Sequence, residues 1–383
     1  MVSATSGAPP RTLRVVPEVR SVDFERSRRS SGHTVIYVGR YPDLDAASVR
    51  GDNHRVGLAT AWRWAFRADW TVVELAEPLW LRALPLTASI ALAVRAADRL
   101  RRRRTRLVCY AMENSDAEQL LRGLPSWARP LALGVVRLSA GRWFDRVAFA
   151  SATTRRRYAE MGLLSRRCHR ALYEDLQEPC ATCVLEAAEE DPVGTGGAAV
   201  RRPRRMTFLG ALETRKGLAD LLAAWRRGGL GRQGWELAVA GAGPLRPELD
   251  RAAQADGSIR PLGLVGRAGV HRVLRETEVV VLPSRREGRW REQIGMSIVE
   301  GLAHGCHVVA CADTGLADWL RGHGHTVLPD RFSEVDLSRA LCAVATARVE
   351  PGRVLATLPS VGGRVAAEAW MYQPEPATPR GES

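Results

Sequence analysis

The sequence predicts an α/β protein built from two Rossmann-like domains, and three observations indicate this fold class. The chain has 383 residues, of which 45% are hydrophobic, and this length suits two domains of about 150 residues better than one core. Short β-branched runs alternate with stretches of helical spacing, which is typical of parallel sheets covered by helices. An acidic and glycine-rich break then divides this alternation into two series.

The first series follows residues 1–33, which are polar and arginine-rich and which we expect to form a disordered N-terminal segment. The run HTVIYVG, ending at Gly39, fits a buried parallel strand followed by a tight loop. We assign residues 34–186 to an N-terminal Rossmann-like domain. Its further strands are predicted at residues 70–75, 106–111 and 145–151, with helices between them.

The second series begins after residues 187–203, where acids are followed by Pro, Gly and small residues, a composition typical of a linker. Residues 204–350 then alternate regularly between strands such as RMTFLG and EVVVLPS and helices such as GLADLLAAWRR and GMSIVEGLAHG. We expect residues 351–383 to form one helix, GGRVAAEAWMY, and a disordered end. Two such domains would face each other across a cleft at the carboxyl ends of their sheets, where α/β folds bind ligands.

Composition restricts the class of partner and the cellular compartment. The net charge of +14 suits anionic partners, but the arginine clusters show neither a nucleic-acid-binding module nor interleaved aromatic residues, which argues against nucleic acid. Residues 1–33 lack the apolar segment of a signal peptide, and the longest apolar run, residues 83–94, is shorter than the ~20 residues that span a bilayer. We therefore expect a cytoplasmic protein. Seven cysteines, an odd number, argue against a disulfide framework.

Lys216 is the only lysine among 56 basic residues, and the other 55 are arginines. It lies in TRKG, between a predicted strand end and a predicted helix start, which is where an α/β domain binds anions. An ammonium approaches phosphate as a compact point charge, whereas the planar guanidinium of arginine requires another geometry. The position therefore predicts a phosphate contact.

Two glutamates, Glu292 and Glu300, have seven residues between them and lie in a loop and the apolar helix that follows it. The start of a helix presents unpaired amides and the positive end of its dipole, so a phosphate can bind there. Carboxylates beside an anion site favour a ligand that combines phosphate with sugar hydroxyls. The predicted amides belong to Gly295, Met296 and Ser297.

With the preceding VLPS, this pattern resembles the E-x7-E signature of the retaining GT-B glycosyltransferases of the group 1, or family 4, type. FLGALETRKGLADLLAAW, LAVAGAGPLRPEL and LGLVGRAGVHRVLRETEVVVLPS resemble further motifs of that family in the second domain. In the first domain only the general alternation and DRVAFASATTRRRYAEMG resemble it. The resemblance implies a GT-B fold with the acceptor on the first domain. It also implies transfer from a nucleotide-diphosphate sugar to an acceptor, with retention of configuration. The basic first domain suggests a lipid-linked or cell-surface glycan as that acceptor.

The resemblance also implies roles for individual residues. Lys216 and Arg215 would contact the diphosphate and stabilise the charge that develops on it. Glu292 would lie near the hydroxyls of the donor sugar, and Glu300 would bind those of the ribose. No divalent metal and no cofactor are implied besides the donor substrate. The remaining nucleotide-sugar contacts are assigned to Gly210, Leu264, Val265, Gly295, Met296 and Ser297, with the backbone around Leu264 and Val265 reading the base.

Two positions depart from the family's pattern. Ala211 stands where many relatives have an arginine, and CYAMENSD in the first domain contains Glu113 and Asn114 where many relatives have a histidine. A second interpretation is therefore a catalytically degenerate GT-B protein that binds a sugar nucleotide or a partner glycosyltransferase.

Two further features lie outside these motifs. PCATC contains Cys180 and Cys183, with Cys168 and His169 upstream, but a structural zinc site needs four suitably spaced ligands, so we expect unpaired thiols in a loop. Arginines 101–104 suit the C-terminal end of a helix dipole. Together with residues 126–138 they predict a basic, partly apolar surface. Such a surface suits peripheral contact with anionic lipid on the inner face of the plasma membrane.

Overall fold

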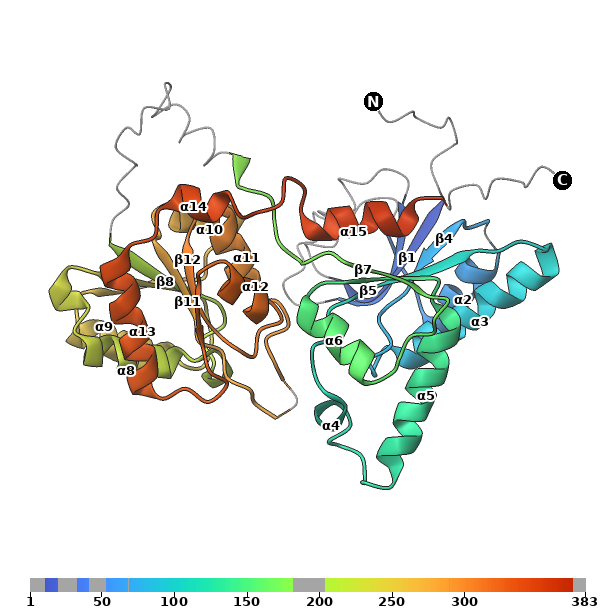
Figure 1. The fold of residues 1–383 in the computed structure, drawn as a ribbon, viewed down its shortest axis with the longest axis horizontal. Coiled ribbons are helices and arrows are strands. Elements are labelled where there is room, and N and C mark those ends of the chain that lie inside the picture. The colour runs from blue at the N-terminus through green and yellow to red at the C-terminus, as the bar shows by residue number, and fades with distance from the viewer. Residues whose placement is uncertain are drawn as a thin grey trace. The chain divides into compact units, whose positions relative to one another are not determined.

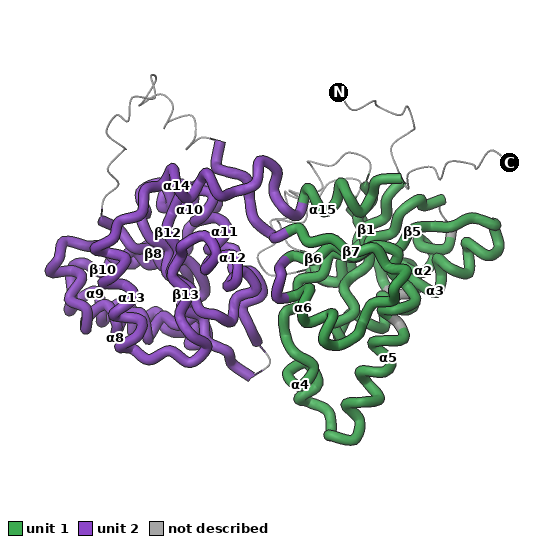
Figure 2. The backbone as a smooth tube through the Cα atoms, viewed as in Figure 1, with its two compact units in different colours: residues 1–150, 154–173, 365–383 green, residues 151–153, 174–364 purple. Residues whose placement is uncertain are grey.

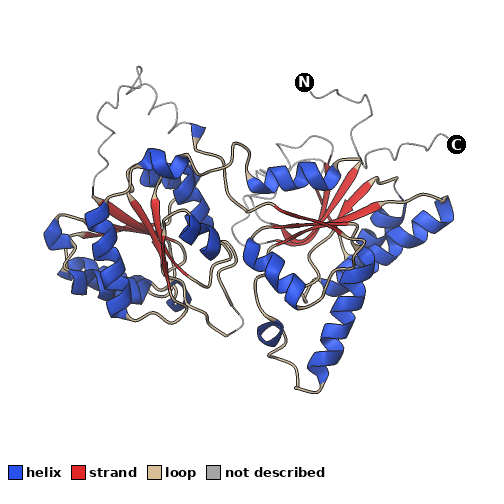
Figure 3. Cartoon of the chain, viewed as in Figure 1, coloured by secondary structure: helices blue, strands red, loops and turns tan. Residues whose placement is uncertain are grey.

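The structure is a computed structural model that describes residues 11–19, 33–40, 53–67, 69–181, 204–288 and 290–374. The chain divides into two compact units (Figure 2). Unit 1 comprises residues 1–150, 154–173 and 365–383, and unit 2 comprises residues 151–153 and 174–364. In each unit helices flank both faces of one sheet (Figure 3). The predicted linker at residues 187–203 lies outside the described residues.

The described part of unit 1 contains a seven-stranded sheet (Figure 1). Its strands are β1 (Thr12–Val19), β2 (His33–Arg40), β3 (Asn53–Arg55), β4 (Val72–Glu74), β5 (Arg106–Ala111), β6 (Arg146–Phe149) and β7 (His169–Leu172). They pair in parallel in the order β3-β2-β1-β4-β5-β6-β7. The helices are α2 (Leu58–Arg67), α3 (Leu84–Arg101), α4 (Ala117–Leu120), α5 (Ala128–Trp143), α6 (Ala152–Glu160) and α15 (Gly363–Tyr372).

The predicted disorder of residues 1–33 is wrong for β1, which pairs with both β2 and β4 inside the sheet. Two residues make this strand hard to predict from the sequence. Arg14 is a charged residue at a position that is only 7% exposed, and Pro17 cannot donate a ladder hydrogen bond. Arg14 is compensated by Glu74 and Glu368, each 3.7 Å from its guanidinium nitrogens. A buried charge of this kind requires such partners, and they lie far away in the sequence.

The C-terminal helix α15 belongs to unit 1 and not to a separate tail. Arg146 donates hydrogen bonds to the carbonyl oxygens of Trp370, at 2.5 Å, and Gln373, at 2.9 Å. Its guanidinium also lies 5.5 Å from the ring centroid of Trp370, and the Tyr372 hydroxyl donates to Glu74. These contacts fix the last helix of the chain beside β1, β4 and β6.

The described part of unit 2 contains a six-stranded parallel sheet in which every strand pair is parallel. Its strands are β8 (Arg205–Leu209), β9 (Glu236–Ala240), β10 (Ile259–Gly263), β11 (Val279–Leu282), β12 (His307–Cys311) and β13 (Thr326–Leu328). Their order is β10-β9-β8-β11-β12-β13. The α-helices are α8 (Leu218–Gly228), α9 (Arg246–Ala255), α10 (Arg267–Arg275), α11 (Met296–Ala303), α12 (Ala317–Gly322), α13 (Glu334–Ala347) and α14 (Pro351–Leu355), with 3-10 turns η2 (Thr214–Lys216) and η3 (Gly231–Gln233).

The predicted strands and helices of the second series are confirmed, because both faces of this sheet are covered and its strands are continuous apolar runs. All four residues of β11 are buried, and Trp225 of α8 is fully buried. The strand order reverses between β8 and β11, and ligands of open α/β sheets bind at the carboxyl ends of strands at such a point. No helix in the described part of the chain is long and apolar enough to cross a membrane.

Candidate functional site

The candidate site of unit 2 lies in the loops that follow β8 and β11, the two strands at which the sheet order reverses. The loop after β8 contains η2 and continues into Gly217, whose φ of 75° favours glycine. A Cβ atom on Gly217 would lie 2.1 Å from the carbonyl oxygen of Pro283, which follows β11. Arg285 N–H also donates to the carbonyl oxygen of Arg215 at 2.8 Å. The two loops are therefore in direct backbone contact.

Lys216 and Glu292 form an ion pair between these loops, with 2.6 Å separating Nζ from Oε2. The Ser284 hydroxyl donates to the same carboxylate oxygen at 3.0 Å. The side chains of Lys216 and Glu292 are only 16% and 11% exposed, so both charges are held in a defined geometry with limited solvent screening. The structure therefore brings together two of the residues assigned to catalysis from the sequence.

Arg215 lies beside Lys216 under an aromatic ring that the sequence did not predict. Its guanidinium carbon is 4.3 Å from the ring centroid of Trp290, and Lys216 Nζ is 4.9 Å from the same centroid. Arg215 Nε also pairs with Glu213 at 2.5 Å. An aromatic face stabilises cations electrostatically, so Trp290 positions both basic groups. The only sequence signal for it was its place two residues before Glu292.

The loop that carries Trp290 is fixed by arginine pairs. Arg285 donates two hydrogen bonds to Asp220, at 2.6 and 2.8 Å, a bidentate geometry that restrains both side chains. Arg286 and Arg291 both donate to Asp313 Oδ1 at 2.8 Å. The side chains of Arg291 and Asp313 are 5% and 2% exposed. These pairs hold the segment between β11 and α11 against the body of the unit.

Helix α11 begins at Met296, and its N-cap is Gly295 with a φ of 85°. The predicted helix start is therefore confirmed, and Gly295 supplies a backbone conformation that other residues rarely adopt. Ser297 is buried and the Met296 side chain is 38% exposed. Glu300 lies inside the helix, where its Oε1 is 3.6 Å from Arg267 Nη1 of α10.

Gly210, Leu264 and Val265 occupy separate places in unit 2. Gly210 directly follows β8, and its N–H donates to the carbonyl oxygen of Ala240 at 3.0 Å. Leu264 and Val265 follow β10, at the edge of the sheet and two strands from β8. The Leu264 side chain is 83% exposed, which is unusual for leucine and leaves it available to a ligand.

In unit 1 the segment with Glu113 and Asn114 is held by a buried acid that sequence reasoning missed. The carboxylate of Glu77 accepts hydrogen bonds from the backbone amides of Met112 and Glu113 at 3.0 to 3.1 Å and from the Tyr158 hydroxyl at 2.9 Å. Burial, together with the nearby Glu113 charge, raises the pKa of Glu77 to about 7. Its only signal in the sequence is an acid placed soon after a buried strand.

The cysteines lie in different surroundings. Cys168 packs in the core of unit 1, where burial raises the pKa of its thiol to about 12, whereas Cys180 belongs to unit 2. Cys183 lies outside the described residues. Cys180 is a free cysteine, as expected, and its Sγ lies 3.6 Å from Nδ1 of His271, a contact that the sequence did not predict.

Comparison with known proteins finds a family match within unit 2 and a structural likeness over both units. Residues 203–346 match the family described as Glycosyl transferases group 1. Among solved structures, Anabaena HepE in complex with UDP and glucose aligns over 94% of this chain and 95% of its own, with a TM-score of 0.58 and 13% identity. A UDP-forming trehalose-phosphate synthase from Burkholderia vietnamiensis aligns over 95% and 97%, with a TM-score of 0.64 and 13% identity.

WaaG, a glycosyltransferase involved in lipopolysaccharide biosynthesis, aligns over 94% of this chain and 99% of its own, with a TM-score of 0.57 and 11% identity. No curated protein matches the chain at a significant level. The fold is GT-B. The GT-B neighbours extend the likeness over both units, although the sequence family is matched in unit 2 alone.

Proposed function

We propose that this GT-B protein is a glycosyltransferase that moves a sugar from a nucleotide-diphosphate sugar to an acceptor glycan with retention of configuration. The observation that carries the proposal is the Lys216–Glu292 ion pair between β8 and β11, within the residues that match the glycosyltransferase family. A similar structure, Anabaena HepE, has been solved with UDP-glucose. A UDP-sugar is accordingly the first donor to test.

The reaction requires stabilisation of a diphosphate leaving group. The amides at the start of α11 offer unpaired donors and the positive end of the helix dipole, while Lys216 and Arg215 add two cations at the neighbouring strand end. Groups held in place before the reaction stabilise developing charge without reorganisation. Glu292 holds the Lys216 ammonium at 2.6 Å, and in this proposal its carboxylate also accepts a hydrogen bond from a donor-sugar hydroxyl. This arrangement supplies the electrostatic role without a divalent metal.

Unit 1 offers a hollow for an acceptor at the carboxyl ends of β1 and β2, next to the point between β1 and β4 where the order of its sheet reverses. An indole and an arginine side chain can stack on and hydrogen-bond to sugar rings. The hollow is lined by Pro17, Glu18, Val38, Gly39, Trp80, Arg82 and Leu86. We assign glycan binding to this hollow.

The test combines a binding screen with product analysis. The full-length protein is expected to show a raised unfolding temperature with one nucleoside diphosphate and its sugar, since a ligand that binds only the folded state stabilises it. With that donor alone it should slowly release nucleoside diphosphate. Nuclear magnetic resonance of the first sugar released should show the donor's anomeric configuration. Inversion would refute retention. Binding without turnover across donors and glycan acceptors would favour the catalytically degenerate alternative.

The proposed acceptor class includes lipid-linked glycans, and unit 1 carries a surface suited to an anionic membrane. Along α5 and the residue preceding it, Trp127, Leu131, Val135 and Leu138 are 54% to 77% exposed. Their spacing of four, four and three positions places them on one helix face. Arg122, Arg137 and Arg142 are exposed nearby. An apolar stripe with flanking cations is the pattern of a helix that lies on an anionic bilayer.

We expect the protein to sediment with phosphatidylglycerol vesicles and not with phosphatidylcholine vesicles at low salt. Replacing Leu131 and Leu138 with serine should weaken this binding by about tenfold or more, because each buried leucine contributes about 1 to 2 kcal/mol. The matched control replaces Leu92 and Leu100 of α3, which are 63% and 74% exposed. Equal loss in both double variants would show that the α5 face is not the contact.

A further inference from the structure

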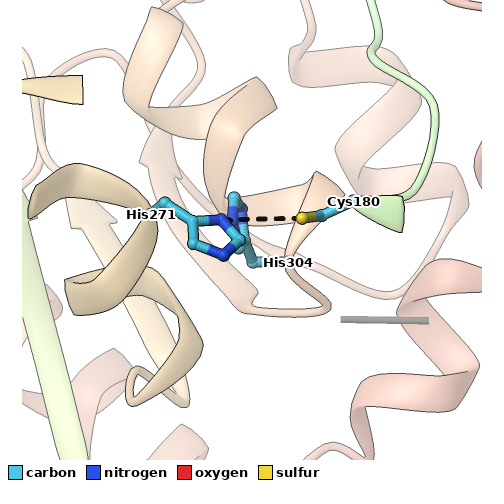
Figure 4. A group of neighbouring side chains, drawn as sticks. All are labelled: Cys180, His271 and His304. Carbon is cyan, nitrogen blue, oxygen red and sulfur yellow. Dashed lines mark hydrogen bonds between the residues drawn. The ribbon is translucent and has the colours of Figure 1, made fainter. Parts of the chain in front are cut away.

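Three side chains of unit 2 with metal-ligating atoms converge on one point, away from the Lys216–Glu292 pair in the sequence and in the hydrogen-bond network. They are Cys180, His271 of α10 and His304, the C-cap of α11 (Figure 4). Their ligand atoms all lie within 4.8 Å of one another. Cys180 Sγ is 3.6 Å from His271 Nδ1, which is 2.8 Å from His304 Nε2.

The backbone holds two of these side chains in place. Cys180 N–H donates to the carbonyl oxygen of Ala303 at 2.8 Å, which fixes the cysteine at the end of α11. His304 Nδ1 is 2.7 Å from the carbonyl oxygen of Glu300. Because a carbonyl oxygen only accepts, Nδ1 carries the proton and the Nε2 lone pair points at the other two residues. Metal-binding histidines commonly donate their second ring nitrogen to a backbone carbonyl in this way.

A single proton cannot bridge all three atoms. With His304 Nε2 as an acceptor, His271 Nδ1–H can donate to it, and that nitrogen then has no lone pair to accept a hydrogen bond from the Cys180 thiol. A metal ion in place of the proton would bind all three atoms at once. A metal ion therefore accounts for the positions of all three ligand atoms, whereas a chain of hydrogen bonds accounts for only part of them.

Two of the three separations between ligand atoms lie near those of a zinc site, and the third, from Cys180 Sγ to His304 Nε2, is within 4.8 Å. Zn–S and Zn–N bonds of about 2.3 and 2.05 Å at a tetrahedral angle place S and N about 3.6 Å apart and two nitrogens about 3.3 Å apart. The observed 3.6 Å already matches the first separation, and the two imidazoles would move apart by about 0.5 Å to reach the second. Two imidazoles and one thiolate are ligands that Zn²⁺ prefers. His304 is 8% exposed and the other two residues are half-buried, so an ion can enter from one side.

We propose that Cys180, His271 and His304 bind a Zn²⁺ ion, with water as the fourth ligand. The ion would tie the segment at Cys180 to α10 and α11, the helices that carry Arg267 and Glu300. It would stabilise the framework of unit 2 and take no part in sugar transfer. The proposal is independent of the proposed transferase activity, since its tests measure metal binding and stability.

The first experiment uses the full-length wild-type chain, stripped with a chelator and then titrated with Zn²⁺ and with Co²⁺. We expect about one ion per chain, a higher unfolding temperature with Zn²⁺, and a thiolate-to-cobalt charge-transfer band with Co²⁺. Zn²⁺ should also protect Cys180 from alkylation, measured by peptide mass spectrometry, while leaving Cys342 unchanged. Cys342 is a matched internal control because it is also a half-buried cysteine of unit 2.

The second experiment uses Cys180→Ser, His271→Gln and His304→Gln. Each is expected to lower Zn²⁺ affinity by at least about 100-fold, since loss of an outer-shell partner alone costs 10- to 100-fold. Cys342→Ser and His323→Gln serve as controls and should bind as wild type. Absence of stoichiometric binding, absence of the charge-transfer band, or unchanged affinity in the three variants would each overturn the proposal. Because the alkylation experiment uses the wild-type chain, it tests the proposal even if one of the variants folds poorly.

Discussion

Replacing Lys216 with alanine is expected to lower kcat/KM for donor hydrolysis by about 10²- to 10³-fold, the usual cost of removing one group that stabilises developing negative charge. Lys216 Nζ lies 2.6 Å from Glu292 and 4.9 Å from the Trp290 ring centroid, so its ammonium is already positioned before a donor binds. Without it, the site loses one preorganised positive charge at the diphosphate. The measurement is the steady-state release of nucleoside diphosphate from the preferred donor.

The matched control is Arg227→Ala. Arg227 is also a cation of unit 2 paired with a carboxylate, Glu334 at 2.8 Å, but its side chain is 53% exposed and exposed pairs contribute little. We expect its rate to equal that of wild type. Lys216→Arg should retain part of the activity, because charge is kept while the geometry changes. If the Lys216→Ala protein is as active as the Arg227→Ala protein, Lys216 has no catalytic role and the proposed function loses its main support.

A double-mutant cycle with Glu292→Gln separates the two roles of the carboxylate. If Glu292 does nothing but hold Lys216, the second substitution should have no effect in the Lys216→Ala background. We expect a further loss of rate, because the proposal also gives Glu292 a hydrogen bond to the donor sugar. In the Lys216→Ala variant the Ser284 hydroxyl, which donates to Glu292 at 3.0 Å, keeps the Glu292 carboxylate in place.

The sequence predicted that Lys216 and Glu292 lie at one site although 76 positions separate them, but it did not predict their ion pair. TRKG and the loop before the E-x7-E helix each follow an apolar run that reads as a buried strand. Because parallel strands direct their carboxyl ends to one edge of a sheet, residues that follow them converge there. The core of unit 2 was predictable for the same reason, since its central strands are mainly apolar and the charged residues Arg205 and Glu236 stand only at the starts of β8 and β9.

What could not be predicted depends on long-range partners. Strand β1 was missed because Arg14 interrupts its apolar pattern, and the acids that neutralise it, Glu74 and Glu368, are identified only by the fold. Cys180 and His271 are separated by 91 positions and belong to no shared motif. Trp290 lies over Arg215 and Lys216 because of a local turn, in which Glu287 and Trp290 exchange backbone hydrogen bonds. Periodicity carries no information on such contacts.

Acidification is expected to destabilise unit 2 through two buried histidines of the β12 and β13 region, His307 and His325. They are 4% and 7% exposed. Burial lowers the pKa of His307 to about 4, and burial with the nearby His307 and His323 lowers the pKa of His325 to about 3. Val308 N–H donates to His325 Nδ1 at 3.3 Å, so a proton on that nitrogen would place two donors against each other.

Proton binding by the two histidines determines whether the free energy of unfolding rises or falls with pH. Between the unfolded pKa near 6.5 and the lower folded values, the unfolded chain binds more protons than the native chain, so the free energy of unfolding falls as pH falls. Stability is therefore fully present above about pH 6.5, and each histidine is expected to remove about 2 kcal/mol between about pH 7.5 and about pH 5. Urea unfolding at the two pH values, followed by hydrogen exchange in peptides of β12 and β13, measures this loss within unit 2.

Two substitutions isolate the histidines from the carboxylates that also titrate in acid. His307→Gln retains a group that can hydrogen-bond Thr326, now 3.0 Å from His307 Nε2, and His325→Asn retains an acceptor for Val308 N–H, but neither side chain can be protonated in this range. The double variant should lose much less stability on acidification than wild type. His169→Asn, at an exposed position in unit 1, should leave the loss unchanged. If the double variant and wild type lose stability equally, carboxylates and not this histidine pair govern the response of unit 2 to acid.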